Sequence, residues 1–432
     1  MCVWFITTSN AIRCADPDLP VDTNNAAAKR GDSDFASFGL VALLSLIFGI
    51  AAFATDMYLP AFPAIRATFS VEPQRVQMSM SLFLYGNAVG HLFFGPLSDR
   101  LGRKPVMLAG LIAYAFASLG CAWVTTMDAF LGMRALQGAA AASGPVLVRA
   151  LINDRLSREQ AAQTLALLTG TMAFAAMLTP SIGGWLVQHH PWQWIFTGLG
   201  VGAIFLTLVC AIQIHETLPI SRRLGSFGPK EVLRGYVEIG GDKRFWCYVL
   251  PPSFMFAGVF AYAAVNSFLL IDELGVQEQH YGMTYSVAAS AYVAGSLAGR
   301  TVVRTTGIDR AIAIGIGVGL TAAAVATAAS LLMPMSVALV LLPGLFMFFT
   351  AALILPIGFS TAVSLFPARG GSASALAGFT QLTFAAISSG IAAGLYDGTT
   401  LPLHVFTLGC CVTALAAWLG GRGIRHTTIA TH

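Results

Sequence analysis

The most informative stretch of this chain is a charged hairpin, rich in small residues, that lies between two apolar runs. It reads Gly95-Pro96-Leu97-Ser98-Asp99-Arg100-Leu101-Gly102-Arg103-Lys104-Pro105. The apolar run 76–95 precedes it and the apolar run 106–124 follows it. Because glycine allows tight turns and close approach of helices, the pattern predicts two antiparallel helices joined by a short charged turn.

Apolar runs of this length recur along the whole chain. The 432 residues are 56% hydrophobic and only 10% charged, whereas ordinary soluble domains are about 25% charged. A bilayer tolerates only segments that satisfy their own backbone, and one crossing takes about 20 helical residues. We therefore predict an all-α membrane protein with twelve transmembrane helices in two six-helix bundles, at about 38–60, 76–95, 106–124, 127–150, 164–187, 193–214, 245–270, 281–302, 311–332, 336–360, 372–395 and 402–421.

The longest polar stretch between these runs divides the chain into two sets of six helices. The sequence predicts five segments: a disordered cytoplasmic tail 1–37, a bundle 38–214, a cytoplasmic linker 215–244, a bundle 245–421 and a cytoplasmic tail 422–432. The apolar patch at residues 3–6 is too short for the core of a secretory signal. An over-long start is the alternative for residues 1–37.

The two halves also share spaced residues. An offset of 205 positions matches Gly90 with Gly295, Leu92 with Leu297, Gly102 with Gly307 and Gly110 with Gly315. Near this offset, Phe-Ala-Ala at 174–176 recurs at 384–386. With 44 glycines in the chain, chance supplies some matches. Together with the six-plus-six layout they favour a duplicated transporter core whose halves rock about a central site.

The basic residues are distributed unevenly between the predicted loops. If the amino terminus is inside, only Arg66 and Arg75 of the 24 Lys and Arg lie in outer loops, and Arg134 lies within a helix. This asymmetry follows the positive-inside rule, so we predict a multi-pass protein of the bacterial inner membrane with both termini in the cytoplasm. A nucleic-acid surface is the rival interpretation, but the basic clusters alternate with spans, and we expect no nucleic-acid partner.

The hairpin matches the pattern G-x-x-x-D-R-x-G-R-K at Gly95, Asp99, Arg100, Gly102, Arg103 and Lys104. With segments 54–63, 134–138 and 371–378, it resembles the major facilitator superfamily. Within that superfamily the chain is most similar to drug/proton antiporters with twelve spans, of the bicyclomycin- and chloramphenicol-resistance (Bcr/CflA) type, over residues 38–420. The resemblance implies that the six hairpin residues control conformational gating, with Asp99 and the arginines as a charge lock between the bundles. A plain cytoplasmic turn is the alternative.

Two charged residues inside spans are the main functional candidates. Asp56 ends the first apolar run, and an ionisable group at membrane depth is costly unless it is paired, hydrated or protonated. The resemblance implies that Arg134, in an R-x-x-Q-G pattern, relays protons. Pairing would favour the charged Asp56, and protonation of Asp56 would release Arg134. The alternatives are a permanently paired structural acid at Asp56 and an arginine at 134 that snorkels to the surface.

The fifth predicted span resembles an antiporter signature. Its residues are Gly170, Pro180, Gly183 and Gly184, although Thr179 stands where the signature has glycine. Small residues also allow plain helix packing. Some relatives carry a second acid two turns before the position of Asp56, where this chain has Phe48. A single acid favours neutral or weakly lipophilic substrates.

Other polar residues within spans are candidates for a substrate cavity, although each is also a common helix–helix hydrogen bonder: Tyr85, Asn87, Tyr262, Asn266, Tyr292 and Gln381. The seven cysteines show no metal-ligand spacing, and no phosphate-binding loop of the ATPase type occurs. We therefore expect no metal site, no cofactor and no catalytic residues, with the proton gradient as the energy source.

These features predict a proton-coupled antiporter that exports drugs or other small lipophilic compounds by alternating access. Its partners would be protons, a small-molecule substrate and the lipid bilayer, and the resemblance implies that it functions as a monomer. The same machinery could instead export an endogenous metabolite such as a siderophore, an amino acid or a sugar. A non-transporting membrane sensor and uptake by proton symport are further alternatives.

Overall fold

The computed structural model describes residues 38–156, 158–218, 229–366 and 369–424. The predicted tail 1–37 and most of the tail 422–432 lie outside them. Within the described ranges the chain is helical and contains no strand. The helices of the first half are α2 (Phe38–Phe48), α3 (Ile50–Asp56), α4 (Phe62–Phe69), α5 (Pro73–Leu101), α6 (Arg103–Trp123), α7 (Met127–Ala141), α8 (Ser143–Arg155), α9 (Arg158–His189) and α10 (Gln193–Gln213).

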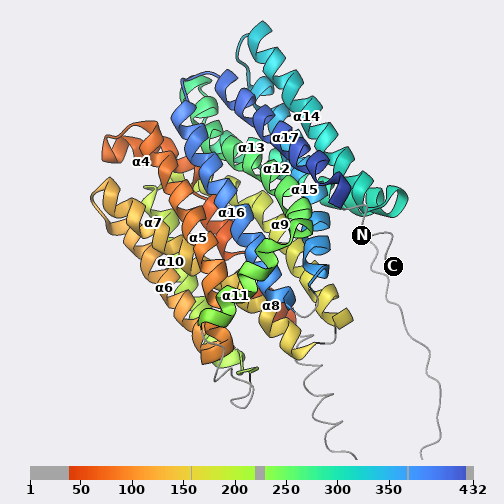
Figure 1. Ribbon diagram of the computed structural model, residues 1–432. Helices are drawn as coiled ribbons and strands as arrows, with labels where there is room; N and C mark the ends of the chain where they lie inside the picture. The colour runs from red at the N-terminus through yellow and green to blue at the C-terminus, as the bar shows by residue number, and fades with distance from the viewer. Residues whose placement is uncertain (1–37, 157, 219–228, 367–368, 425–432) are drawn as a thin grey trace, which may run out of the picture. The chain divides into compact units, whose positions relative to one another are not determined.

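A short amphipathic helix and six longer elements follow (Figure 1). They are α11 (Pro229–Gly241), α12 (Lys243–Ser267) with the π-helical turn η3 (Phe268–Glu273), α13 (Glu278–Thr306), α14 (Ile308–Leu332), α15 (Val337–Ser364), α16 (Gly370–Leu395) and α17 (Leu401–Gly420). A helix therefore stands at each of the twelve predicted spans, and the fold is an all-α membrane fold as predicted.

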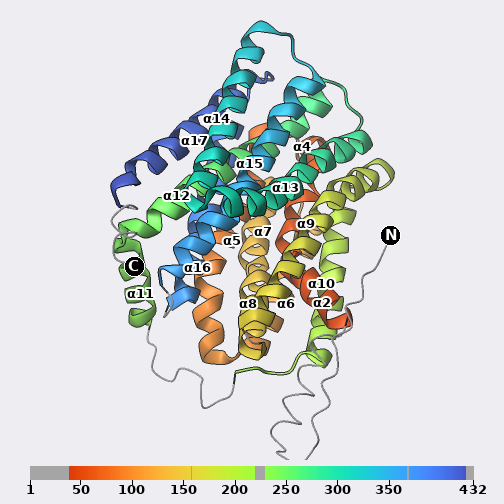
Figure 2. The same cartoon turned by 90° about the vertical axis from the view of Figure 1, so that its right-hand side faces the viewer.

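Not every helix is equally apolar. Among the described residues, eight helices are long and apolar enough to cross a membrane, or nine if the bent pair Gly39–Phe48 and Ile50–Phe69 counts as one span. The other three predicted spans, α5, α9 and α13, are 29, 32 and 29 residues long. They are also the helices that join the two halves of the chain, because α5 packs along α16 and α9 packs along α13 (Figure 2). A helix buried among protein neighbours can carry more polar residues than one that faces lipid.

The first span departs from the single helix predicted over 38–60. It bends by 51° at Gly49 and ends its α-helical part at Asp56. Pro60 lies in the 3₁₀ turn η1 (Leu59–Ala61) that follows. Proline cannot donate a backbone hydrogen bond within a helix and clashes with the preceding turn, so Asp56 lies where the regular helix stops.

The matched glycines of the two halves occupy equivalent places. Gly102, between α5 and α6, has φ +104°, and Gly307, between α13 and α14, has φ +84°. A Cβ at Gly90 of α5 would lie 2.4 Å from a backbone oxygen of α7, and one at Gly295 of α13 would lie 2.0 Å from a backbone oxygen of α15. The offset of 205 residues therefore reflects a repeated structure.

The predicted linker 215–244 contains the helix α11. Its residue Ile239 is fully buried and packs in one cluster with Phe245 and Val249 of α12 and with Ala373 and Ala377 of α16. By their contacts, the described residues from Ala42 onward form one compact unit. The boundary between two six-helix bundles at this linker therefore stays a prediction.

Candidate functional site

Asp56 is a half-buried carboxyl at the end of α3. The Thr55 hydroxyl donates a hydrogen bond to its Oδ1 at 3.2 Å. Tyr281 and Tyr285 of α13, in the second half of the chain, interact electrostatically with it. Asp56 is thus an acid at the junction of the two halves that keeps some accessible surface.

Arg134 of α7 is fully buried. Its guanidinium donates a hydrogen bond to Oε1 of Gln137, and Nε2 of Gln137 donates in turn to the Ser118 hydroxyl at 2.7 Å. Three aromatic rings surround the guanidinium, with centroids 4.2, 4.4 and 5.6 Å from its Cζ: Tyr58, Phe83 and Phe196. A cation over an aromatic face is stabilised by about 2 kcal/mol or more when it is desolvated. These contacts hold Arg134 in an aromatic cage inside the first half.

The expected ion pair between Asp56 and Arg134 is absent from the described part of the chain, so that expectation is wrong for this conformation. Tyr58 takes the position beside Arg134, and its hydroxyl lies 3.2 Å from that of Ser79. Successive helical residues are about 100° apart. Residues 56 and 58 therefore point to nearly opposite sides, Tyr58 towards α7 and Asp56 towards α13.

Tyr281 and Tyr285 are functional candidates that the sequence analysis missed. Tyr281 donates a hydrogen bond to Oδ1 of Asn266 on α12 at 2.8 Å, and the two tyrosine rings have centroids 6.2 Å apart. Their spacing of four residues places them on one face of α13. That spacing was a usable signal, but nothing in it indicated that this face meets Asp56.

Several buried polar atoms near this junction have no hydrogen-bond partner among the described residues. They include both amide atoms of Gln77, Nδ2 of Asn266, the hydroxyl of Tyr262, and those of Ser267 and Ser389. A buried polar group without a partner costs about 1–3 kcal/mol. α5, α12 and α16 thus carry spare hydrogen-bonding capacity that a polar ligand or a proton relay can use.

The predicted signature of the fifth span lies directly against this junction. A Cβ at Gly183 of α9 would be 1.9 Å from the carbonyl oxygen of Met57, the residue after Asp56. On α13, a Cβ at Gly282 would be 2.5 Å from the carbonyl oxygen of Pro180. Thr179 is buried, as is Gly184; Gly170 belongs to α9, but its packing lies outside the described side chains. Small residues therefore seat α9 against both the Asp56 segment and α13.

At the end of the helices nearer Asp56, contacts join the two halves. Arg66 of α4 and Asp272 of η3 form an ion pair at 2.6 Å. The rings of Phe62 and Phe268 have centroids 5.8 Å apart. The hydroxyls of Ser181 and Ser286 lie 2.9 Å apart. This end of the junction is closed by ionic, aromatic and polar contacts.

The charged hairpin lies at the opposite end of α5. Arg103 pairs with Asp99 at 2.5 Å and with Asp154 of α8 at 3.0 Å, and Lys104 donates to the Ala211 carbonyl at 2.8 Å. Arg100 is exposed, and no described side chain or backbone atom lies within 4 Å of a Cβ built at Gly95. Each of these contacts stays within the first half. The predicted charge lock between the bundles is therefore replaced, in this conformation, by a lock among α5, α6, α8 and the end of α10.

Glu216, just beyond α10, completes this lock. Its Oε1 accepts hydrogen bonds from the backbone N–H groups of Arg103, Thr217 and Leu218, each at 3.0 Å. Burial opposes ionisation of this carboxyl, but the backbone N–H groups outweigh it and lower the pKa of Glu216. The sequence analysis missed Glu216 because its partners are backbone groups that become available only in the folded turn.

α11 contacts both halves at the hairpin end. The Tyr236 hydroxyl donates to the Leu92 carbonyl of α5 at 3.2 Å, and Glu238 forms an ion pair with Arg369 before α16. Burial, followed by the nearby negative charge of Asp99, raises the pKa of Tyr236 to about 12. This short helix therefore connects the hairpin region of the first half to α16 of the second.

The predicted cavity residues are scattered. Asn266 and Tyr262 are buried on α12 near the Asp56 junction, and Asn87 is buried on α5. Tyr292 and Gln381 are half-buried on α13 and α16. Tyr85 is 53% exposed, on the same face of α5 as the exposed Val89 and Phe93, which is the pattern of a surface facing lipid. The structure thus brings only part of this set to the junction.

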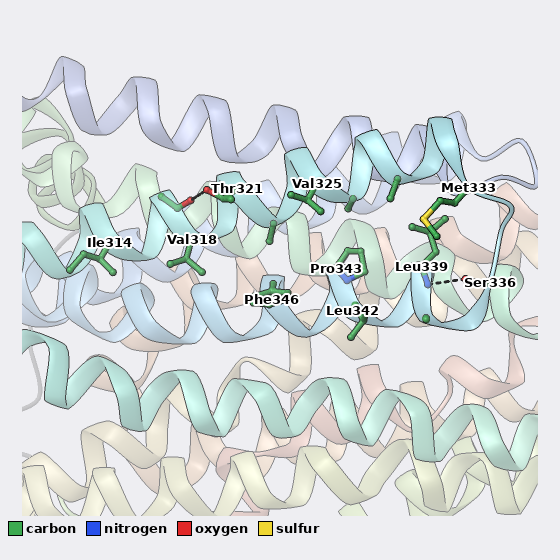
Figure 3. Close-up of a pocket in the computed structure, with 15 residues that line it drawn as sticks. Ile314, Val318, Thr321, Val325, Met333, Ser336, Leu339, Leu342, Pro343 and Phe346 are labelled. Carbon is green, nitrogen blue, oxygen red and sulfur yellow. Dashed lines mark hydrogen bonds between the residues drawn. The ribbon is translucent and has the colours of Figure 1, made fainter.

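One pocket of the described structure lies away from this site. It is an apolar groove of about 750 Å³ on the side of α14 and α15, lined by residues such as Val318, Val325, Leu339 and Phe346 (Figure 3). It has no charged lining residue.

The described residues also contain no group of three or more His, Cys, Asp or Glu side chains placed to hold a metal ion.

Known proteins match the chain over most of its length. It is 26% identical to the bicyclomycin resistance protein homolog of Haemophilus influenzae, over 87% of this chain and 94% of the relative. It is 30% identical to the uncharacterized MFS-type transporter YdgK of Bacillus subtilis, over 88% and 94% of the two chains. It is 28% identical to multidrug resistance protein D of Escherichia coli, over 82% and 88%.

Solved structures agree on the fold. The partially occluded, inward-open xylose transporter XylE from E. coli superposes with a TM-score of 0.68 at 13% identity, covering 88% of this chain and 97% of that one. A bacterial homolog of the lysosomal transporter Spinster, inward-facing, gives 0.64 at 14% identity, covering 88% and 95%. The family model described as Major Facilitator Superfamily matches residues 44–421. The chain belongs to the Major Facilitator Superfamily.

Proposed function

We propose that this protein is a proton-coupled efflux antiporter of the bacterial inner membrane that exports small lipophilic compounds, including drugs, by alternating access. The observation that carries the proposal is the position of Asp56, an accessible carboxyl of the first half that faces the tyrosines of α13 in the second half. Two relatives named for bicyclomycin and multidrug resistance support the drug class. The proton gradient is the energy source, no cofactor takes part, and the protein works as a monomer.

In this proposal Asp56 is the proton carrier. A charged carboxylate at membrane depth is costly, and protonation removes that cost. Asp56 ends α3, which packs against α9, and it interacts electrostatically with two tyrosines of α13, so its charge acts on the contact between the halves. Substrate from the cytoplasm or inner leaflet competes with the proton for the site. After the substrate has left, the deprotonated Asp56 can again accept a proton from outside.

Arg134 holds a fixed positive charge in this scheme. Because it is caged by Tyr58, Phe83 and Phe196, it is linked to Asp56 in this conformation through Tyr58, which lies two residues from Asp56. A rearrangement that brings Asp56 to Arg134 belongs to another state of the cycle. Gly183 and Pro180 of α9 seal the junction against proton leak.

The proposed orientation places the hairpin end in the cytoplasm and the Arg66–Asp272 pair on the outer side, with both termini inside. Opening outward must then break this pair, whose side chains are 43% and 25% exposed. Such exposed pairs contribute at most about 1 kcal/mol. One proton that crosses a potential of 100 mV supplies about 2.3 kcal/mol, or roughly 50-fold in concentration, which exceeds this cost.

Proton flux in inside-out membrane vesicles tests the proposal. Vesicles with an acidified lumen receive candidate compounds one at a time, and a pH-sensitive dye reports proton release. We expect substrates to restore the dye signal with the unmodified protein and not with Asp56→Asn. Asp128→Asn is the matched control, because Asp128 is 83% exposed and pairs with Arg75 at the start of α5. Coupled transport that persists in Asp56→Asn would refute the proposal.

A further inference from the structure

α8 carries a second interior arginine, Arg149, which the sequence analysis did not single out. The helix continues to Arg155, so Arg149 lies about 9 Å from its end at 1.5 Å per residue. Its helical neighbours Val148, Leu151 and Ile152 are buried, whereas Arg149 itself is exposed. The side chain therefore occupies accessible space deeper than the hairpin charges.

The contacts of Arg149 show that this space lies between helices. Its Cζ is 5.3 Å from the centroid of Phe48 on α2, and Phe48 is only 5% exposed. It also interacts electrostatically with His91 of α5, which is 8% exposed. A Cβ at Gly378 of α16 would lie 3.1 Å from Nδ1 of His91. Arg149 thus lies over the ring of Phe48 and acts electrostatically on His91. His91 itself lies where α5 of the first half meets α16 of the second.

Arg149 differs from Arg134 in being available to a ligand. Arg134 is fully buried, hydrogen-bonded to Gln137 and enclosed by three rings. Arg149 is exposed, rests on one ring, and forms no ion pair in the described ranges. A guanidinium offers a planar fork of donors that matches a carboxylate. Beside it, Phe48 offers an apolar surface for the body of the same molecule.

We propose that Arg149 and Phe48 form an anion-recognising subsite on the substrate path, and that the exported compounds include lipophilic molecules with one carboxylate. This inference rests on the proposed export function. Phe48 precedes Asp56 by eight residues across the bend at Gly49, so at 1.5 Å per residue the path between them is at most about 12 Å, a span that suits the apolar body of such a molecule. The expectation of neutral substrates counted the acids but missed Arg149.

The energetics of anion export are consistent with this subsite. Each charge that moves through 100 mV changes the attainable concentration ratio by about 50-fold. An anion that leaves while one proton enters moves two charges in the favourable direction, whereas a neutral substrate moves one. Export of the anionic substrate therefore depends more steeply on the membrane potential.

A matched pair of probes tests the inference. Chloramphenicol and its monosuccinate ester share one body and differ by a carboxylate. Binding of each to the purified full-length protein in liposomes is measured by quenching of intrinsic fluorescence. We expect the ester to bind at least about tenfold more tightly than chloramphenicol, the effect of one charge-assisted contact. We expect Arg149→Gln to abolish this preference and Arg149→Lys to keep part of it. Arg75→Gln, which removes an exposed arginine at the other end of α5, should leave it unchanged.

The outcomes separate the subsite from the export function. An ester that binds no better than chloramphenicol, or not at all, overturns the inference, as does a preference that survives in Arg149→Gln. If proton flux depends on Asp56 but no anion preference is found, the proposed export function is supported and the subsite is refuted. Preference that depends on Arg149 without proton flux supports the subsite and contradicts the antiporter. Equal elution and melting of the variants show that each is folded.

Discussion

Gly183→Ala is the sharpest test of how α9 is seated against the Asp56 segment. The added Cβ would lie 1.9 Å from the carbonyl oxygen of Met57, whereas ordinary contact begins at 3.4 Å. α9 or the chain at Met57 must therefore move by about 1.5 Å, the difference between those two distances. The obstacle is backbone, so rotation of a side chain cannot relieve it.

The expected cost follows from this overlap. Overpacking of a well-packed interior costs about 1–3 kcal/mol. Replacing glycine by alanine within a helix also stabilises the helix by up to about 1 kcal/mol. The control must therefore be a glycine-to-alanine change in a helix as well. Gly198→Ala in α10 provides it, because no atom lies within 4 Å of a Cβ built there. The two variants should therefore differ by about 1–3 kcal/mol, with Gly183→Ala the less stable.

The assay combines stability with transport. Thermal melting in detergent, followed by the monodisperse fraction, should place Gly183→Ala about 1–3 °C below Gly198→Ala. Proton-coupled flux should fall steeply in Gly183→Ala alone, because displacement of Met57 moves Asp56 relative to Tyr281. If both variants melt together and transport equally, the close seating of α9 on Met57 is refuted.

Three further predictions concern the two ends of the helices. Gly102→Ala places a side chain at φ +104° and should cost about 1–3 kcal/mol, whereas Gly95→Ala should cost nothing measurable by melting. Arg66→Asp, which faces Asp272 with a like charge, should slow transport, and the double variant with Asp272→Arg should restore it; no rescue would contradict the outer contact. Because its folded pKa lies below its ordinary 4.5, Glu216 stabilises the fold above that pH and loses this effect as the pH falls through the folded value. Glu216→Gln should therefore lower the melting temperature at neutral pH and much less in strong acid.

The positions of the helices could be predicted from the sequence, because a bilayer allows only long apolar helices. The turn at Gly102 was also predictable, since glycines and charges bounded it. Asp56 was recognisable because an acid in an apolar run is rare. These features depend on local sequence, and the structure places them as expected.

The side on which each residue faces its neighbours was less predictable. The pairing of Asp56 with Arg134 was expected from shared depth alone. Tyr58 occupies that contact instead, because Asp56 and Tyr58 point to nearly opposite sides of the first span. Tyr281 and Arg149 were missed for a related reason. The partners of each residue lie on a helix that is distant in the sequence. A single sequence does not reveal which helix faces pack together.

The ion pair between Arg66 and Asp272 joins residues 206 positions apart, within one position of the offset of 205 that relates the two halves. Its partners are therefore nearly the same place in each copy of the repeat. In a symmetric dimer of a single half, that place would face its own duplicate, and two arginines or two aspartates would repel each other. Within one chain, the first copy can carry the basic residue and the second copy the acidic residue. The pair is therefore a contact that two identical halves could not make, and it distinguishes the two halves at this point.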